Sequence, residues 1–131
     1  MEVEGTEEEL RELKRDLEEE KKRKIVYICS PFRGDVKGNI ERARKYSVWC
    51  YEQGGLPLCV HLFLENATGL SEDKGNRGEL LKLGRFFVPM CDELWVFGKE
   101  LSEGMLGEIE VAVKSGVKVK WRILPDGNSG L

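Results

Sequence analysis

Short apolar runs that alternate with helical segments constrain the fold of this chain most strongly. Residues 24–30 (KIVYICS) are β-branched, aromatic and almost continuously apolar, as expected of a strand buried on both faces of a parallel sheet. Similar runs follow at residues 56–64, 93–98 and 117–124, and helical patterns separate them at residues 38–53, 77–91 and 104–115. The alternation predicts βαβ units with right-handed crossovers. We therefore expect a Rossmann-like (flavodoxin-like) α/β sandwich of three layers, with a parallel sheet of four or five strands in which the four identified strands are ordered 2-1-3-4.

The chain divides into a charged N-terminal helical extension (residues 1–23), one α/β domain (residues 24–124) and a flexible tail (residues 125–131). Thr6 followed by Glu9 is a capping box, which predicts a helix over residues 6–23. Its apolar residues form a thin stripe: Leu10, Leu13 and Leu17. Such a helix either packs on the domain or pairs with its copy in a second subunit, and a mostly solvated extension fits the pattern equally well.

The charge distribution argues against a nucleic-acid polymer as the partner. Residues 25–131 carry fourteen acids and fourteen bases, whereas phosphate neutralisation requires a basic surplus. No apolar run approaches the ~20 residues of a membrane span, and the N-terminus has no signal-peptide pattern. We expect a cytoplasmic protein that does not contact a membrane.

The cysteine pattern gives no indication of a metal site. Cys29, Cys50, Cys59 and Cys91 show no C-x-x-C spacing, and His61 is the only histidine. We interpret the cysteines as small buried hydrophobic residues in a reducing compartment.

The carboxyl ends of parallel strands are where ligands bind in such folds, and the first of them leads into SPFRGD (residues 30–35). A turn there presents backbone N–H groups, Gly34 allows close approach of a ligand, and Arg33 can grip a phosphate with two donors. Ser-Pro and Arg-Gly are also ordinary turn pieces, so a purely structural turn is equally compatible.

The loop after the third strand leads into a helix whose N-terminus is a second candidate anion site. Ser102 either binds an anion there or serves as the N-cap. Two acids follow: Glu110 has Lys114 four residues later and is expected to be solvated, whereas Glu108 borders the apolar stripe. A first-turn Glu is also a favourable partner of the helix dipole.

Three ring side chains are candidate ligand contacts. A histidine within an apolar strand is more often packed in the core or at its rim than catalytic, and the position of His61 near the ligand end of the predicted second strand narrows that difference. Tyr27 and Trp95 could stack on a base, but both alternate with aliphatic strand residues, which favours core packing.

YICSPFRGD, the VH pair, CDELWVFG and SEGMLGEIEVAVKSG together resemble segments of the nucleoside 2-deoxyribosyltransferase-like superfamily, over about residues 24–121. Within it, the resemblance is to 2′-deoxynucleoside 5′-monophosphate N-hydrolases and small uncharacterised relatives. It implies a nucleotide-binding domain that forms homodimers or higher homo-oligomers and needs no cofactor. It further implies an N-glycosidase, a hydrolase or transferase acting on (deoxy)nucleoside 5′-monophosphates, with Glu108 as the nucleophile at the anomeric carbon. The substrate and its phosphate would be held by Ser30, Pro31, Phe32, Arg33, Gly34, His61, Ser102, Gly104 and Met105.

One position departs from the pattern. The hydrolases carry a catalytic Asp eight residues before the acid that opens the third strand, and counting back from Asp92 gives Gly84. The nearest acid on that helix is Glu79. The alternative function is therefore a non-catalytic module that binds a nucleotide or a nucleotide-derived signal.

Overall fold

Four parallel strands form the sheet in the computed structural model, which describes residues 5–71 and 75–124. They are β1 (Ile25–Cys29), β2 (Leu56–Leu58), β3 (Glu93–Val96) and β4 (Lys118–Trp121). They pair in the order β2-β1-β3-β4, and every pairing is parallel. The predicted fold class, a Rossmann-like α/β sandwich, and the predicted strand order are confirmed.

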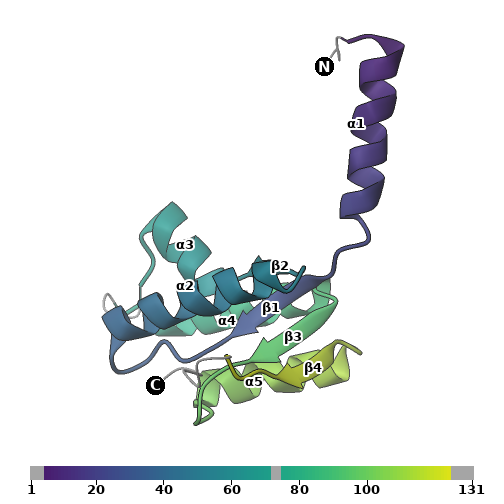
Figure 1. Cartoon of the computed structure of the whole chain (residues 1–131). Coiled ribbons are helices and arrows are strands. Elements are labelled where there is room, and N and C mark those ends of the chain that lie inside the picture. The colour runs from purple at the N-terminus through teal and green to yellow at the C-terminus, as the bar shows by residue number, and fades with distance from the viewer. Residues whose placement is uncertain (1–4, 72–74, 125–131) are drawn as a thin grey trace.

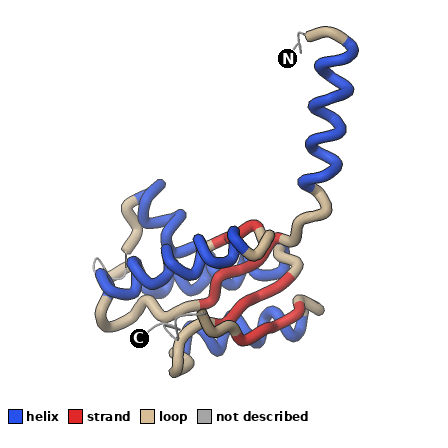
Figure 2. Tube along the Cα trace, in the orientation of Figure 1, coloured by secondary structure: helices blue, strands red, loops and turns tan. Residues whose placement is uncertain are grey.

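Helices cover the two faces of the sheet. α2 (Val36–Glu52) lies on one face, and α4 (Arg77–Phe87) and α5 (Glu103–Lys114) lie on the other (Figures 1 and 2). Alternate residues of β1 therefore enter different halves of the core: Val26 and Ile28 pack on the α2 side, whereas Tyr27 and Cys29 pack on the α4–α5 side.

The second predicted strand is wrong beyond Leu58. At Val60 the chain enters a helix, α3 (Val60–Thr68), so His61 lies in the first turn of a helix. Residues 60, 61 and 64 are buried, which is helical spacing. A short apolar run cannot by itself distinguish a strand from a buried helix face.

α3 continues to Thr68 and ends at Gly69 with a φ of 77°, where the loop to α4 begins. Residues 72–74 of that loop and the predicted tail at residues 125–131 lie outside the described residues. α4 runs without interruption through Gly84, and a 3₁₀ turn, η2 (Val88–Met90), follows it at Pro89.

The N-terminal helix, α1 (Glu7–Glu20), extends away from the sheet (Figure 1), and none of its residues is buried. Its predicted cap is confirmed, since the Thr6 hydroxyl accepts from the Glu9 amide at 3.1 Å. Packing of α1 on its own domain is not observed. Within the described residues, no helix combines the length and the apolar character needed to cross a membrane. The four cysteines are buried and form no disulfide, as predicted.

Candidate functional site

The structure brings all ten sequence-predicted site residues to two adjoining cavities beyond the carboxyl ends of β1 and β3. Eight of them line an inner cavity of about 10 Å³: Ser30, Phe32, Arg33, His61, Ser102, Gly104, Met105 and Glu108. The other two, Pro31 and Gly34, line an outer cavity of about 450 Å³. Arg33 and Ser102 line both cavities and therefore mark the boundary between them.

Glu108 is the buried carboxylate of this site. It lies on α5 with only 3% of its surface exposed. Its Oε2 atom accepts a hydrogen bond from the Tyr27 hydroxyl, and its Oε1 atom lies 3.6 Å from the Cys29 thiol. Burial raises the pKa of Glu108 to about 7, against the two hydrogen bonds and the charge of Arg85, which lower it. Glu108 therefore changes its protonation state near neutral pH.

Tyr27 is a site residue whose role the sequence did not identify. It is 1% exposed and belongs to the core, as its strand pattern favoured, but its hydroxyl donates to Glu108. Burial and the neighbouring Glu108 hold its pKa well above the usual value, so it remains a donor at neutral pH. The alternation of β1 places Tyr27 on the α4–α5 side, but the contact depends on how α5 packs there. Trp95, the other strand residue whose ring could stack on a base, is also buried in the core.

Gly84 makes room for this pair of side chains. A Cβ atom added at Gly84 would lie 2.6 Å from Oε2 of Glu108 and 2.8 Å from the hydroxyl of Tyr27. A carboxylate at this position would displace both groups from their present positions. Glu79 is exposed and lines neither cavity, so it does not substitute for one.

The N-terminus of α5 forms the polar end of the site. Ser102 caps the helix, because its Oγ atom accepts from the Met105 amide at 3.2 Å, and its own hydroxyl hydrogen is left to donate. An added Cβ at Gly104 would lie 2.5 Å from the Cδ2 atom of Leu81 on α4, so glycine leaves room for that side chain at this helix end. The helix dipole favours an anion at this place.

Ser30 supplies a second, independent sign of a polar ligand. Its side chain is 5% exposed and lines the inner cavity, yet its Oγ atom has no hydrogen-bond partner among the described residues. Buried hydroxyl groups in folded proteins are nearly always paired with protein, water or ligand. The exposed Arg33, on the same loop, adds a positive charge to the same cavity.

His61 reaches the cavity from α3 rather than from a strand end. Its ring stacks on Phe32 with 4.2 Å between the ring centroids. Burial lowers the pKa of His61 to about 4, and the positive charge of Arg77 adds to the effect. The imidazole is neutral at pH 7 and suits a hydrogen bond better than proton donation. Arg77 and Leu81 of α4 also line the cavity; neither is distinguished by any sequence motif.

The inner cavity is large enough for about one water molecule. A nucleotide sugar therefore reaches Glu108 only if side chains at the boundary, such as Arg33, move aside. Arg33 is exposed, so its displacement requires little repacking.

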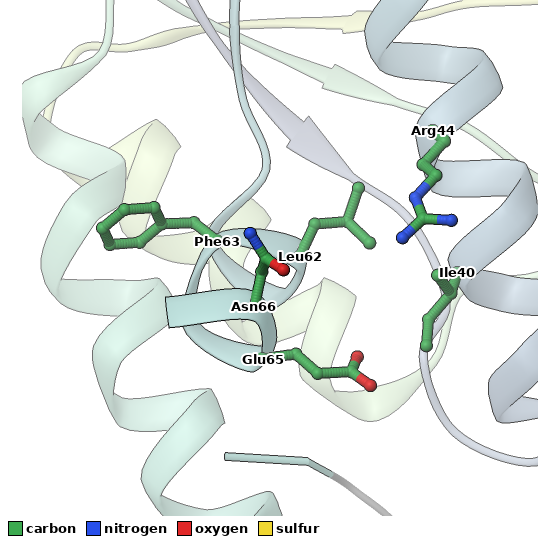
Figure 3. A pocket seen from close by; sticks show the side chains of 6 residues that line it. All are labelled: Ile40, Arg44, Leu62, Phe63, Glu65 and Asn66. Carbon is green, nitrogen blue, oxygen red and sulfur yellow. The ribbon is translucent and has the colours of Figure 1, made fainter. Parts of the chain in front are cut away.

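A different cavity, of about 560 Å³, lies between α2 and α3. Figure 3 shows Ile40 and Arg44 of α2 facing Leu62 and Glu65 of α3 across it. It contains none of the predicted site residues. Its size alone does not make it the site of chemistry.

Among the described residues, no group of three or more His, Cys, Asp or Glu side chains is placed to hold a metal ion. A family model described as "Domain of unknown function (DUF7768)" matches residues 24–122. No curated protein and no solved structure matches the chain. The matched segment contains the sheet, both cavities and all ten predicted site residues, and it leaves out α1.

Proposed function

The chain belongs to the DUF7768 family, and since that family's description assigns no activity, we propose a function from the site: cleavage of the N-glycosidic bond of a (deoxy)nucleoside 5′-monophosphate, with Glu108 as the nucleophile. The observation that carries the proposal is a buried carboxylate, with a pKa of about 7, in one cavity with a helix N-terminus, a guanidinium and an unpaired hydroxyl.

Glu108 would attack the anomeric carbon as the bond to the base nitrogen breaks. The electron pair of that bond leaves with the base, which takes up a proton, and a glycosyl ester with Glu108 forms. Water then attacks the same carbon and releases the sugar phosphate, which regenerates the carboxylate; transfer to a second base is the alternative outcome. The Tyr27 hydroxyl orients the carboxylate through its hydrogen bond. The reaction requires no organic cofactor.

The polar end of the site supports a phosphate-bearing substrate. Arg33, Ser30 and Ser102 offer a charge and two hydroxyl groups beside the α5 N-terminus. These are the donors that a 5′-phosphate requires at a fixed separation from the nucleophile. The resemblance of the SPFRG and SEGM segments to the deoxynucleotide hydrolases supports the same assignment. Four unpaired cysteines fit a reducing, cytoplasmic setting.

A second candidate function is the binding of a nucleotide or a nucleotide-derived signal without turnover. Gly84 in place of the hydrolases' acid and the narrow inner cavity favour this candidate.

The deciding experiment is incubation of the protein with a panel of nucleoside and deoxynucleoside 5′-monophosphates, with chromatographic detection of free base. Base release that is lost in Glu108→Gln supports the enzyme. Thermal stabilisation by a monophosphate without base release rejects the enzyme and supports the binding module.

A further inference from the structure

A groove of about 510 Å³ lies on the α2 side of the sheet, and it is distinct from the candidate site. It runs between the C-terminal end of α2, where Trp49 and Gln53 line it, and the β3–β4 half of the sheet. Figure 1 shows α2 in front of the sheet and α5 behind β3 and β4, so in the described residues no helix stands in front of β4. Parallel sheets are ordinarily covered by helices on both faces.

The groove is strongly basic. Its lining includes five basic residues and one acid: Lys22, Arg23, Lys24, Lys120, Arg122 and Glu93. The negative charge of Glu93 is already balanced within the groove, since Glu93 accepts from Lys24 at 2.9 Å and pairs with Lys120 at 3.0 Å. On the same face of β4, Lys118 adds another positive charge, because residues 118, 120 and 122 alternate with those that face α5. The groove therefore favours an acidic occupant.

α1 is acidic, which complements the basic groove, and none of its residues is buried against its own domain. Residues 7–20 carry eight acids and three bases. Leu10, Leu13 and Leu17 are exposed by 39%, 53% and 54%. Glu9 and Asp16 flank this stripe, since they lie four residues before and three residues after Leu13. Fourteen helical residues span about 21 Å, so α1 has the length of a helix that could cover β4 on this face of the sheet.

The connection between α1 and β1 directs the helix away from its own groove. The Arg23 guanidinium donates to the carbonyl oxygens of Gly54 and Gly55 at 3.1 and 3.2 Å, and it also donates to Glu20 at 3.2 Å. It lies over the Tyr51 ring, 4.9 Å from the ring centroid. These contacts fix the last turn of α1 to the edge of the domain from which the helix extends outward (Figure 1).

We propose that α1 docks in the basic groove of a second copy of this chain, and that the two copies exchange their helices reciprocally. Residues 22–24 both follow α1 and line the groove, so each helix leaves its domain beside the groove. Two copies related by a two-fold axis can therefore each place α1 in the groove of the other. Pairing of α1 with α1 is disfavoured: both ends of the helix, at residues 7–9 and 18–20, are wholly acidic, so parallel and antiparallel pairs both oppose like charges.

Sedimentation velocity of the full chain tests this, and the expected species is a dimer whose dissociation constant rises with salt. Glu9→Lys with Asp16→Lys reverses the charge beside the leucine stripe and is expected to weaken association at least tenfold. The matched control is Glu8→Lys with Glu19→Lys, which makes the same change in net charge. Glu8 lies two residues before Leu10 and Glu19 two residues after Leu17, so both are on the side of the helix opposite the leucine stripe. This control is expected to change the dissociation constant no more than a few-fold.

The groove is tested from the other side by Lys118→Glu with Arg122→Glu, which is expected to weaken association by a similar factor. Its control is Lys45→Glu with Lys82→Glu, two exposed lysines on α2 and α4. A chain with both the helix and the groove reversals is expected to recover the wild-type dissociation constant within a few-fold. A monomeric wild-type chain, or reversals that do not rescue each other, would overturn the proposal. A monomer in which amide exchange of α1 is slowed would instead assign the groove to the chain's own helix.

Discussion

Two glutamates that are almost equally hidden from solvent have opposite electrostatic environments. Glu93, at the start of β3, is 2% exposed, and Glu108, on α5, is 3% exposed. Burial raises the pKa of Glu93, but hydrogen bonds from Trp95, Lys24 and Lys120 more than offset it and hold the pKa at about 2. Glu108 has only neutral donors in direct contact and a pKa of about 7. Burial alone therefore does not identify a reactive carboxylate; the charge of its partners does.

The two environments also separate two kinds of role. Glu93 is permanently ionised near pH 7 and connects β3 with residues beside β1 and on β4. Glu108 is held by a tyrosine that keeps its proton, so its carboxylate exchanges a proton near pH 7 without losing its position. The first arrangement stabilises the sheet, whereas the second suits chemistry.

The largest expected effect concerns activity at Glu108. Glu108→Gln is expected to reduce base release at least about 10³-fold, because the amide is not a nucleophile. Gln still accepts from Tyr27, so we expect the fold and nucleotide binding to persist. The measurement is chromatography of released base, with binding followed by calorimetry.

Glu110→Gln is the matched control on the same helix. Glu110 is exposed and bonded to Lys114 at 2.7 Å, as the sequence predicted. Its replacement is expected to leave turnover near wild type and stability within about ±0.5 kcal/mol. Equal activity in the two variants would remove Glu108 from the reaction.

The second prediction contrasts a cation of the candidate site, Arg33, with a cation of the basic groove, Arg122. Arg33→Ala is expected to weaken binding of a nucleoside monophosphate by about 1.5–3 kcal/mol, which is the loss of a hydrogen bond to a charged group. Binding of the corresponding nucleoside should change little. Arg122→Ala, in the basic groove, is expected to leave both affinities unchanged. Titration calorimetry with the two ligands distinguishes these cases, and equal losses for both ligands upon Arg33→Ala would place Arg33 outside the phosphate site.

The third prediction tests Glu93 as a structural group. Glu93→Gln is expected to lower the free energy of unfolding at pH 7 by about 2 kcal/mol, since two lysines lose their charged partner. The folded-state pKa is depressed from 4.5 to about 2. This contribution is therefore complete above pH 4.5 and is lost as the pH falls toward 2. Urea unfolding at pH 7 and pH 3 measures it, and a difference that does not shrink at low pH contradicts the ion-pair explanation.

The sequence predicted those parts of the molecule in which the spacing of the apolar residues fits only one kind of element, a strand or a helix. Four apolar runs gave the number and order of the described strands, and helical spacing separated the solvated Glu110 from Glu108 beside the core. It failed at residues 59–64, where a short apolar run fits both periods. In the folded chain residues 60–64 are helical, so His61 lines the cavity from the first turn of α3 and not from the end of a strand.

The sequence could not give the contacts that set the chemistry of the site. The Tyr27–Glu108 hydrogen bond joins residues 81 positions apart, and no local pattern encodes it. Gly84 illustrates the same limit: from the sequence it is only a position where an acid is missing, whereas in the structure its lack of a side chain leaves the space for Glu108 and Tyr27.

The fourth prediction concerns the pH dependence of Glu108, which should be opposite in sign to that of Glu93. Below about pH 4.5 Glu108 is protonated in both the folded and the unfolded chain. Between pH 4.5 and about 7 the unfolded chain ionises first, so the folded chain loses stability as the pH rises. Glu108→Gln is therefore expected to stabilise the protein at pH 8 by roughly 2–3 kcal/mol and to have little effect at pH 4.5. Activity of the wild type should rise with pH through about 7, as the nucleophile ionises. A stability gain that is the same at both pH values would contradict the raised pKa.

The smallest expected effect comes from the glycine that accommodates the pair. Gly84→Ala places a methyl group 2.6 Å from Glu108 and 2.8 Å from the Tyr27 hydroxyl, and the overpacking is expected to cost about 1 kcal/mol net of the gain in helix propensity. Gly78→Ala, on the same helix, meets nothing within 4 Å and is expected to stabilise the protein by about 0.5 kcal/mol. The displaced carboxylate should also lower the rate of base release in Gly84→Ala, and Gly78→Ala should not change it. Urea unfolding together with the base-release assay checks both effects. Full activity in Gly84→Ala would mean that the position of the Glu108 carboxylate against Tyr27 is not what supports the reaction.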